Sequence, residues 1–330
     1  MGFAIALIAI VALILIAMVG TGVLGWQYLF GVILPYAGIV IFLLGVIYRV
    51  MKWAGSAVPF RIPTTCGQQR SLSWIKHDKL ESPFSLLGVL GRMALEVLFF
   101  RSLFRNTEAE VKAGPRIVYG ANKLLWAAGL AFHWSFLIVF VRHFKYFAEP
   151  VPSWVLGIQS LDGFFEVGLP IILATDVVLL VALSFLFLRR VADPKLRYIS
   201  LPADYFALFL LLGVAGSGVL MRYFYKTDIV AVKELGTGLL ALNPVVPEGI
   251  GVIFFVHLFL VTVLMIYFPF SKLVHMGGVF MSPTRNLANN NRAKRHVNPW
   301  NYPVKMHTYE EYEEEFREVM KAAGLPVEKE

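Results

Sequence analysis

The sequence has little charge and almost no cysteine. Charged residues account for only 16% of its 330 residues, whereas they make up roughly a quarter of an ordinary soluble domain, so the composition argues against a soluble protein. Cys66 is the only cysteine, which excludes an internal disulfide, a cysteine-ligated iron–sulfur cluster and a covalent heme site of the C-x-x-C-H type. The first apolar run has no lysine or arginine before it and no clear cleavage site after it, so we expect a retained helix rather than a signal peptide.

In place of charge, the sequence contains long apolar runs. Hydrophobic residues make up 58% of the chain, and a helix needs about 20 such residues to cross a hydrocarbon core of roughly 30 Å. The candidate spans lie at residues 3–22, 29–50, 119–143, 168–188, 203–223 and 250–270. The predicted fold class is therefore all-α, a polytopic membrane helix bundle with about six transmembrane helices in a lipid bilayer.

The basic residues lie between these runs and indicate the orientation of the chain. Residues 51–118 contain ten lysines and arginines against five acidic residues, and residues 189–202 contain four against one, whereas the connections at 144–167 and 224–249 are close to neutral. Because positively charged loops stay in the cytoplasm, we predict a multi-pass protein of the cytoplasmic membrane with both termini cytoplasmic. The net charge of +8 then reflects topology, and we expect no nucleic-acid partner.

The runs and their connections divide the chain into four parts. In the last part, a polar arm leads to a helix that begins at a capping box of Thr308 and Glu311 and ends at Gly324. The predicted parts are two N-terminal transmembrane helices (1–50), a cytoplasmic loop (51–118), a four-helix domain with the candidate site (119–275) and a cytoplasmic C-terminal tail (276–330).

The cytoplasmic loop contains one further helical segment, Pro83–Phe104. Its charges Arg92, Glu96 and Arg101 fall along one side, while leucines and phenylalanines dominate the other. This pattern is typical of a helix that lies in the membrane interface or against a partner, so we predict an interfacial helix rather than a seventh span.

Four histidines lie in or at the ends of two predicted membrane helices: His133 and His143 on the third, and His257 and His275 on or just beyond the sixth. Ionisable groups are rare at membrane depth and usually mark functional sites, and neutral imidazole is a common axial ligand of heme iron. Taken singly, a helix-end histidine such as His143 is more often an interfacial polar residue than a ligand. Because three crossings separate the two helices, they run antiparallel, which predicts His133 opposite His275 near the cytoplasm and His143 opposite His257 near the outer face.

The spacings of the two pairs differ and require a bend. Ten residues of helix cover roughly 15 Å and eighteen cover roughly 27 Å, so straight parallel helices do not match both pairs. Pro269, between the two later histidines, is expected to bend the helix. Gly213, Gly216 and Gly218 in the fifth run allow a flat macrocycle or a neighbouring helix to approach closely.

Two histidines ten apart on one helix, and two eighteen apart on a helix three spans later, resemble the gamma subunit of respiratory nitrate reductases, a diheme quinol-oxidising cytochrome b. This resemblance covers roughly residues 119–285. The stretches Trp74-Ile75-Lys76, Arg101 to Thr107, His275-Met276-Gly277-Gly278 and Ser282 to Asn286 look like the cytochrome b subunit of the Dsr/Hme complex, and that similarity spans most of the chain.

The resemblance implies two heme b groups, with iron held by His133 and His275 on the inner side and by His143 and His257 on the outer side. It implies menaquinol or menaquinone as the substrate and a cytoplasmic iron–sulfur subunit related to heterodisulfide reductase, linked to dissimilatory sulfur metabolism. It further implies other membrane and extracytoplasmic redox subunits in a prokaryotic cytoplasmic membrane. The chain would be the quinone-reactive electron-transfer subunit of an oxidoreductase. Its extra span and 68-residue loop depart from the nitrate reductase subunit, so that protein's quinone-site residues are not carried over.

A quinol releases protons as well as electrons, so its pocket needs proton acceptors. Asp176, inside the fourth run, is the leading candidate, and Glu166 and Asp162 lie near the same membrane face. Arg142 and Lys145, beside the outer histidine, are candidates for neutralising heme propionates. The alternatives are a helix-to-helix hydrogen bond for Asp176 and solvated interfacial charge for the others.

Two other functions fit the same residues. A proton-coupled membrane transporter would use the buried histidines and Asp176 as a relay, and it would lack the optical bands of b-type heme. A cytochrome b of a hydrogenase or formate dehydrogenase complex would show those bands and differ in its partner subunit.

Overall fold

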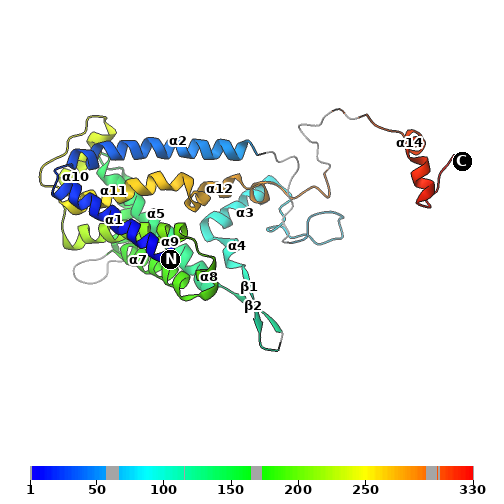
Figure 1. The fold of residues 1–330 in the computed structure, drawn as a ribbon, viewed down its shortest axis with the longest axis horizontal. Helices are drawn as coiled ribbons and strands as arrows, with labels where there is room; N and C mark the ends of the chain where they lie inside the picture. The colour runs from blue at the N-terminus through cyan, green and yellow to red at the C-terminus, as the bar shows by residue number, and fades with distance from the viewer. Residues whose placement is uncertain are drawn as a thin grey trace.

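A computed structural model describes residues 2–56, 67–114, 116–164, 173–294, 303 and 305–329. Six helices lie side by side as a bundle, and successive ones run in opposite directions (Figure 1). Their bounds are α1 (Gly2–Gly22), α2 (Leu34–Ala54), α5 (Lys123–His143), α7 (Ala174–Ala192), α9 (Pro202–Val219) and α11 (Val252–Tyr267). The structure confirms the predicted all-α membrane bundle.

Among the described residues, five helices are long and apolar enough to cross a membrane: Gly2–Gly22, Leu29–Ala54, Lys123–Tyr146, Pro202–Phe224 and Val252–Phe270. The sixth bundle helix, α7, packs between α5 and α9. It is less apolar because it contains Asp176 near its start and Arg189 and Arg190 in its last turn. The early part of its predicted span lies outside the described residues.

The core of the bundle forms where α1, α9 and α11 meet. Ile10, Phe255 and Leu260 are almost completely buried there. A small residue lets α2 approach the same core: a Cβ added at Gly38 would lie 2.7 Å from Thr262 Cγ2. Many isoleucines and leucines of α1 and α2 point outward and stay exposed, as expected of helices that face lipid.

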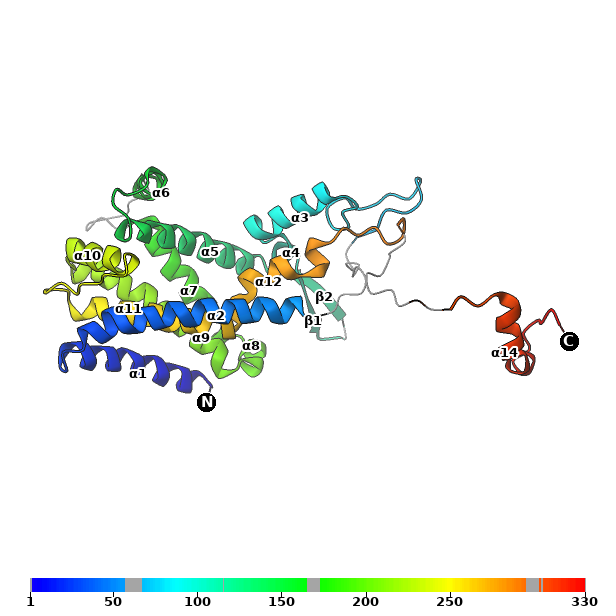
Figure 2. The same cartoon turned by 90° about the horizontal axis from the view of Figure 1, so that it is seen from above.

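The connections gather at two ends of the bundle (Figures 1 and 2). One end, called the basic end here, carries α3 (Leu86–Phe99), α4 (Arg101–Phe104), α8 (Pro194–Ile199), α12 (His275–Met281) and α13 (Pro283–Asn286). The opposite end carries α6 (Ser153–Phe164) and α10 (Ile229–Leu240). Five short turns complete the helices: the π turns η1 (Leu29–Ile33) and η3 (Leu220–Phe224), and the 3-10 turns η2 (Phe144–Tyr146), η4 (Phe268–Phe270) and η5 (Lys272–Val274).

A β-hairpin that the sequence did not predict lies at the basic end. Its strands, β1 (Thr107–Lys112) and β2 (Arg116–Ala121), pair antiparallel with Thr107 opposite Ala121. The predicted third span began at residue 119 and is therefore too long at its start. Asn122 accepts a hydrogen bond from the Leu125 amide (3.1 Å) and caps α5, so the helix begins only at Lys123.

The helix predicted at residues 83–104 is α3, but its arginine Arg92 faces the protein. Arg92 is buried and donates hydrogen bonds to the carbonyl oxygens of Glu81 (3.2 Å), Arg285 (2.6 Å) and Leu287 (3.0 Å). It thereby ties the loop to the segment that follows α12. On the other side, Leu86 and Leu87 are 71% and 80% exposed.

The C-terminal helix α14 (Tyr309–Ala322) forms as predicted. The capping box of Thr308 and Glu311 is present, and Gly324 adopts a left-handed conformation (φ +70°) after the helix. Glu313 accepts hydrogen bonds from the backbone amides of Glu328 (2.8 Å) and Lys329 (2.9 Å). The end of the chain is thereby folded back on α14, away from the bundle (Figure 2).

Candidate functional site

His133 and His275 meet near the basic end of the bundle and are called the basic-end pair. Their ring centres lie 5.9 Å apart, with the ring planes at 83°. His133 lies at the middle of α5. His275 is reached because α11 ends before Pro269, after which the 3-10 turns η4 and η5 carry the chain to α12. The predicted break at the proline is therefore present.

His143 and His257 meet near the opposite end and are called the opposite-end pair. Their ring centres are 6.2 Å apart, and the planes differ by only 14°. His143 is the last residue of α5, and His257 lies in the second turn of α11. The structure thus brings together the two pairs that the antiparallel arrangement predicted.

In each of the four histidines, Nδ1 is held by an oxygen of the protein. Nδ1 of His133, His143 and His275 lies 2.7, 2.6 and 2.9 Å from the carbonyl oxygens three or four residues earlier. Nδ1 of His257 lies 3.1 Å from the Val214 carbonyl oxygen and 2.9 Å from Ser217 Oγ. Because a carbonyl oxygen only accepts, Nδ1 carries the proton and Nε2 keeps its lone pair for a metal.

The geometry of both pairs fits axial ligands of a heme iron. With metal–nitrogen bonds of about 2 Å and a ring radius of about 1.1 Å, two imidazoles on opposite sides of one metal have centres about 6 Å apart. The observed 5.9 and 6.2 Å agree with this value. No group of three or more His, Cys, Asp or Glu side chains in the described part of the chain is placed to hold a metal ion. The two-histidine sites therefore suit an iron whose other four ligands come from a porphyrin.

The glycines of α9 differ in what they contact. A Cβ at Gly218 would lie 3.3 Å from His257 Cε1, so this glycine makes room for the ring of the ligand candidate. A Cβ at Gly213 would lie 3.2 Å from Leu260 Cδ1, so that glycine serves helix packing. At Gly216 a Cβ would meet nothing within 4 Å. Only the last has open space beside it.

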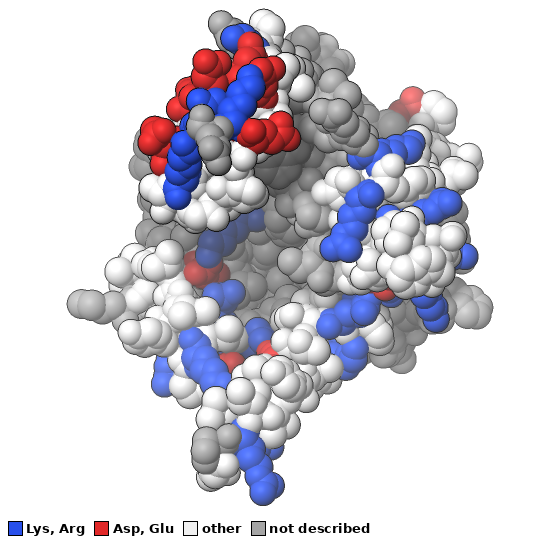
Figure 3. Space-filling model, turned by 90° about the vertical axis from the view of Figure 1, so that its right-hand side faces the viewer, with Lys and Arg blue, Asp and Glu red and all other residues white. Residues whose placement is uncertain are grey.

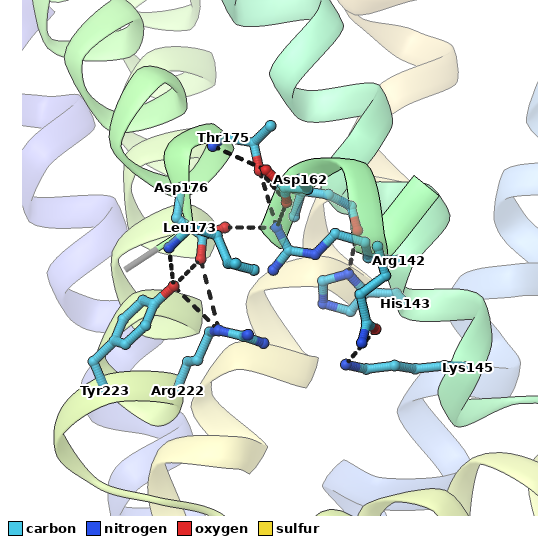
Figure 4. Close-up of polar contacts among 11 residues, drawn as sticks. Arg142, His143, Lys145, Asp162, Leu173, Thr175, Asp176, Arg222 and Tyr223 are labelled. Atoms are coloured by element: carbon cyan, nitrogen blue, oxygen red, sulfur yellow. Dashed lines mark hydrogen bonds and ion pairs between the residues drawn. The ribbon is translucent and has the colours of Figure 1, made fainter. Parts of the chain in front are cut away.

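A buried polar cluster lies next to His143 (Figure 4). Arg142, 6% exposed, contacts the carboxylates of Asp162 and of Asp176 (3.3 Å) and donates to Thr175 Oγ1 (2.9 Å). Thr175 Oγ1 in turn donates to Asp162 (2.7 Å). The two carboxylates are 5% and 7% exposed. One arginine therefore joins α5, α6 and α7 by compensating two buried negative charges.

Residues from η3 extend this cluster. The Tyr223 hydroxyl donates to Asp176, and Arg222 Nε lies 3.9 Å from the same carboxylate. Sequence reasoning missed both residues, because nothing in the pattern of α9 indicates the π turn that orients them. Lys145 donates instead to the Gln159 side chain (3.1 Å), at the edge of the cluster.

The predicted acidic residues thus have different positions. Asp176 and Asp162, which the sequence placed near the same membrane face, lie in one cluster. Glu166 lies outside the described residues. Arg142 is occupied by carboxylates, but its Nε is buried and has no hydrogen-bond partner in the described chain, so one donor stays available to a bound group.

Comparison with known proteins places these residues in a family. The sequence profile of the nitrate reductase gamma subunit family matches residues 86–295, a stretch that includes all four paired histidines. A protein of Archaeoglobus fulgidus described as an Hdr-like menaquinol oxidoreductase cytochrome b-like subunit is 47% identical over 279 residues, which cover 82% of this chain and 83% of that protein. Its counterpart with the same description in Archaeoglobus profundus is 42% identical over 274 residues, 81% of each chain.

Proposed function

Because this chain belongs to the nitrate reductase gamma subunit family, we propose that it is the diheme cytochrome b of a menaquinol oxidoreductase complex in a prokaryotic cytoplasmic membrane. The observation that carries the proposal is the pair of two-histidine sites. In each site the ring centres lie about 6 Å apart, and the Nδ1 contacts leave Nε2 to bind a metal. The menaquinol substrate is proposed from the description of the two Archaeoglobus relatives.

His133 with His275, and His143 with His257, would each hold one heme, so a substrate would react beside the hemes and not at the iron. When bound, the hemes supply one-electron relays between the two ends of the bundle. The chain itself holds the imidazoles in one tautomer and orientation through the Nδ1 contacts. Arg142, through its unpartnered Nε, and the Lys145 amine are proposed to neutralise propionates at the opposite end.

The opposite end is the proposed place of quinol oxidation. Asp176 and Asp162 supply carboxylates there, and Glu166 is proposed to pass protons outward. Electrons would then leave through the His133–His275 pair at the basic end.

The basic end is the proposed contact for a cytoplasmic iron–sulfur subunit related to heterodisulfide reductase and linked to dissimilatory sulfur metabolism. Lysines and arginines are spread over this face, and acidic residues gather on α14 (Figure 3). Arg92 holds the loop and the tail together there. Further membrane and extracytoplasmic redox subunits complete the proposed complex.

Heme content tests the proposal. Reduced-minus-oxidised spectra and heme-to-protein ratios are measured on the purified wild-type chain, on His257→Ala and on His307→Ala, a matched control in the exposed tail. We expect two b-type hemes per chain in the wild type and control and one in His257→Ala. A wild type without heme bands refutes the cytochrome assignment and favours the proton-coupled transporter.

Removal of α14 tests the docking surface. Truncation after residue 294 leaves the Arg92 contacts in place and is expected to release the iron–sulfur subunit from the purified complex without loss of heme. A complex that keeps its composition contradicts the docking role. Recovery of a hydrogenase or formate dehydrogenase subunit with the wild type would instead identify that related class of complex.

A further inference from the structure

The π turn η3 places a tyrosine against the buried carboxylate of the opposite-end cluster. In η3, Leu220–Phe224, the chain leaves the regular geometry of α9, and such π turns are frequent at functional sites. The turn directs Tyr223 and Arg222 toward Asp176 at the start of α7 (Figure 4). Neither residue belongs to the site predicted from the sequence.

The hydrogen bonds of Tyr223 define where its proton can go. Its hydroxyl oxygen accepts from the Leu173 amide (3.1 Å) and from Arg222 Nε (3.1 Å), and its one proton is donated to Asp176. The backbone amide is a fixed partner, whereas the Arg222 side chain is 38% exposed. A hydroxyl of a bound molecule can therefore replace Arg222 and donate to Tyr223 without breaking the bond to Asp176.

Asp176 is connected onward rather than isolated. Its other oxygen lies 3.3 Å from Arg142 Nη1, and the same nitrogen contacts Asp162 on α6. Arg142 therefore donates to both carboxylates and holds Asp176 in place, while the Tyr223 hydroxyl donates its proton to the other Asp176 oxygen. Lys145, the remaining charged group nearby, is held by Gln159.

We propose that Tyr223 and Asp176 form the proton-accepting pair for quinol oxidation at this end of the bundle, with Tyr223 in contact with the quinol hydroxyl. The proposal rests on the proposed function. In each half of the reaction, a quinol O–H bond breaks, its proton moves to the Tyr223 oxygen, and the Tyr223 proton moves to the Asp176 carboxylate. An oxidised heme, held by His143 and His257, would take up the electron. Asp176 then releases its proton to solvent before the second half, so that the quinol loses two protons and two electrons in total.

The competing explanation is that the cluster only holds α5, α6, α7 and η3 together. A structural role predicts a change in stability, whereas a proton-transfer role predicts a change in the rate of quinol oxidation. General acid–base catalysis contributes roughly 10²- to 10⁴-fold to a rate, so the two explanations differ by a measurable amount.

The test uses the full-length, heme-loaded chain in lipid nanodiscs, with menadiol as the quinol. Heme reduction is followed by stopped-flow absorbance between about pH 5 and 9, a range that brackets general acid–base control. The variants are Tyr223→Phe, Asp176→Asn and the matched control Tyr225→Phe, whose ring is 66% exposed in the turn just after η3.

We expect Tyr223→Phe to lower the saturating rate by about 100-fold and to change its pH profile, with little change in the half-saturating menadiol concentration. Asp176→Asn should lower the saturating rate similarly, Tyr225→Phe should match the wild type, and the heme potentials of Tyr223→Phe should stay unchanged. A Tyr223→Phe protein that reduces its hemes at the wild-type rate at every pH overturns the proposal, as does one altered only in stability or in half-saturation. If menadiol does not reduce the wild-type hemes, the proposed function itself fails.

Discussion

Replacing Gly218 tests whether His257 binds a heme iron. A Cβ at this position would lie 3.3 Å from His257 Cε1 and 3.7 Å from Nδ1, whereas carbon atoms pack best at about 3.5–4.0 Å. The ring has little freedom to retreat, because Nδ1 is held by Val214 and Ser217. Gly218→Ala therefore requires a shift of a few tenths of an ångström. Gly218→Val adds two further methyl groups beside the same ring.

Overpacking of this kind costs about 1–3 kcal/mol, which corresponds to roughly 5- to 150-fold weaker binding of one heme. We expect Gly218→Ala to keep two hemes with a shifted signal from one, and Gly218→Val to fall toward one heme per chain. Heme-to-protein ratio and electron paramagnetic resonance measure both effects. Gly91→Val on α3, where a Cβ meets nothing within 4 Å, is the control. Two hemes with unchanged signals in Gly218→Val would refute the assignment of His257.

Three further predictions concern the iron signals, Arg142 and the C-terminal helix α14. Electron paramagnetic resonance of the oxidised protein should show two distinct low-spin iron signals, because the ring planes meet at 14° in one histidine pair and at 83° in the other and would split the iron orbitals differently. A single shared signal would contradict this. Arg142→Gln leaves two buried carboxylates without their counter-charge and should lower the free energy of unfolding by about 3–5 kcal/mol. The control Arg105→Gln, at an exposed ion pair, should lower it by less than about 1 kcal/mol. Equal losses of stability in thermal unfolding would refute the buried network. The backbone amides of Glu328 and Lys329 hold the pKa of Glu313 below its ordinary value of 4.5. These two amides should therefore be protected from hydrogen exchange at neutral pH and lose that protection as the pH falls through the lowered pKa. Amides that stay protected in Glu313→Gln would contradict this role of the carboxylate.

Much of the bundle was predictable because it depends on local composition. A bilayer requires continuous apolar runs, so the helices α1, α2, α9 and α11 stand out in the sequence. The β-hairpin does not, since its strands are exposed along their whole length and show no alternation of apolar and polar residues. The start of α5 was misplaced for the related reason that Tyr119, Gly120 and Ala121 belong to an exposed strand and not to the apolar helix.

The sequence by itself determined which histidines meet. On antiparallel helices, His133 can lie opposite His275 at one depth and His143 opposite His257 at the other. Pro269 supplies the break in the helix between His257 and His275. Only the tertiary structure decided what surrounds them. Arg142, Asp176 and Tyr223 are separated by 34 and 47 residues, and their contact depends on how α5 and α7 are rotated about their axes and on a π turn at the end of α9. Helix rotation and turn geometry arise from packing between distant segments, and no local pattern of residues records them.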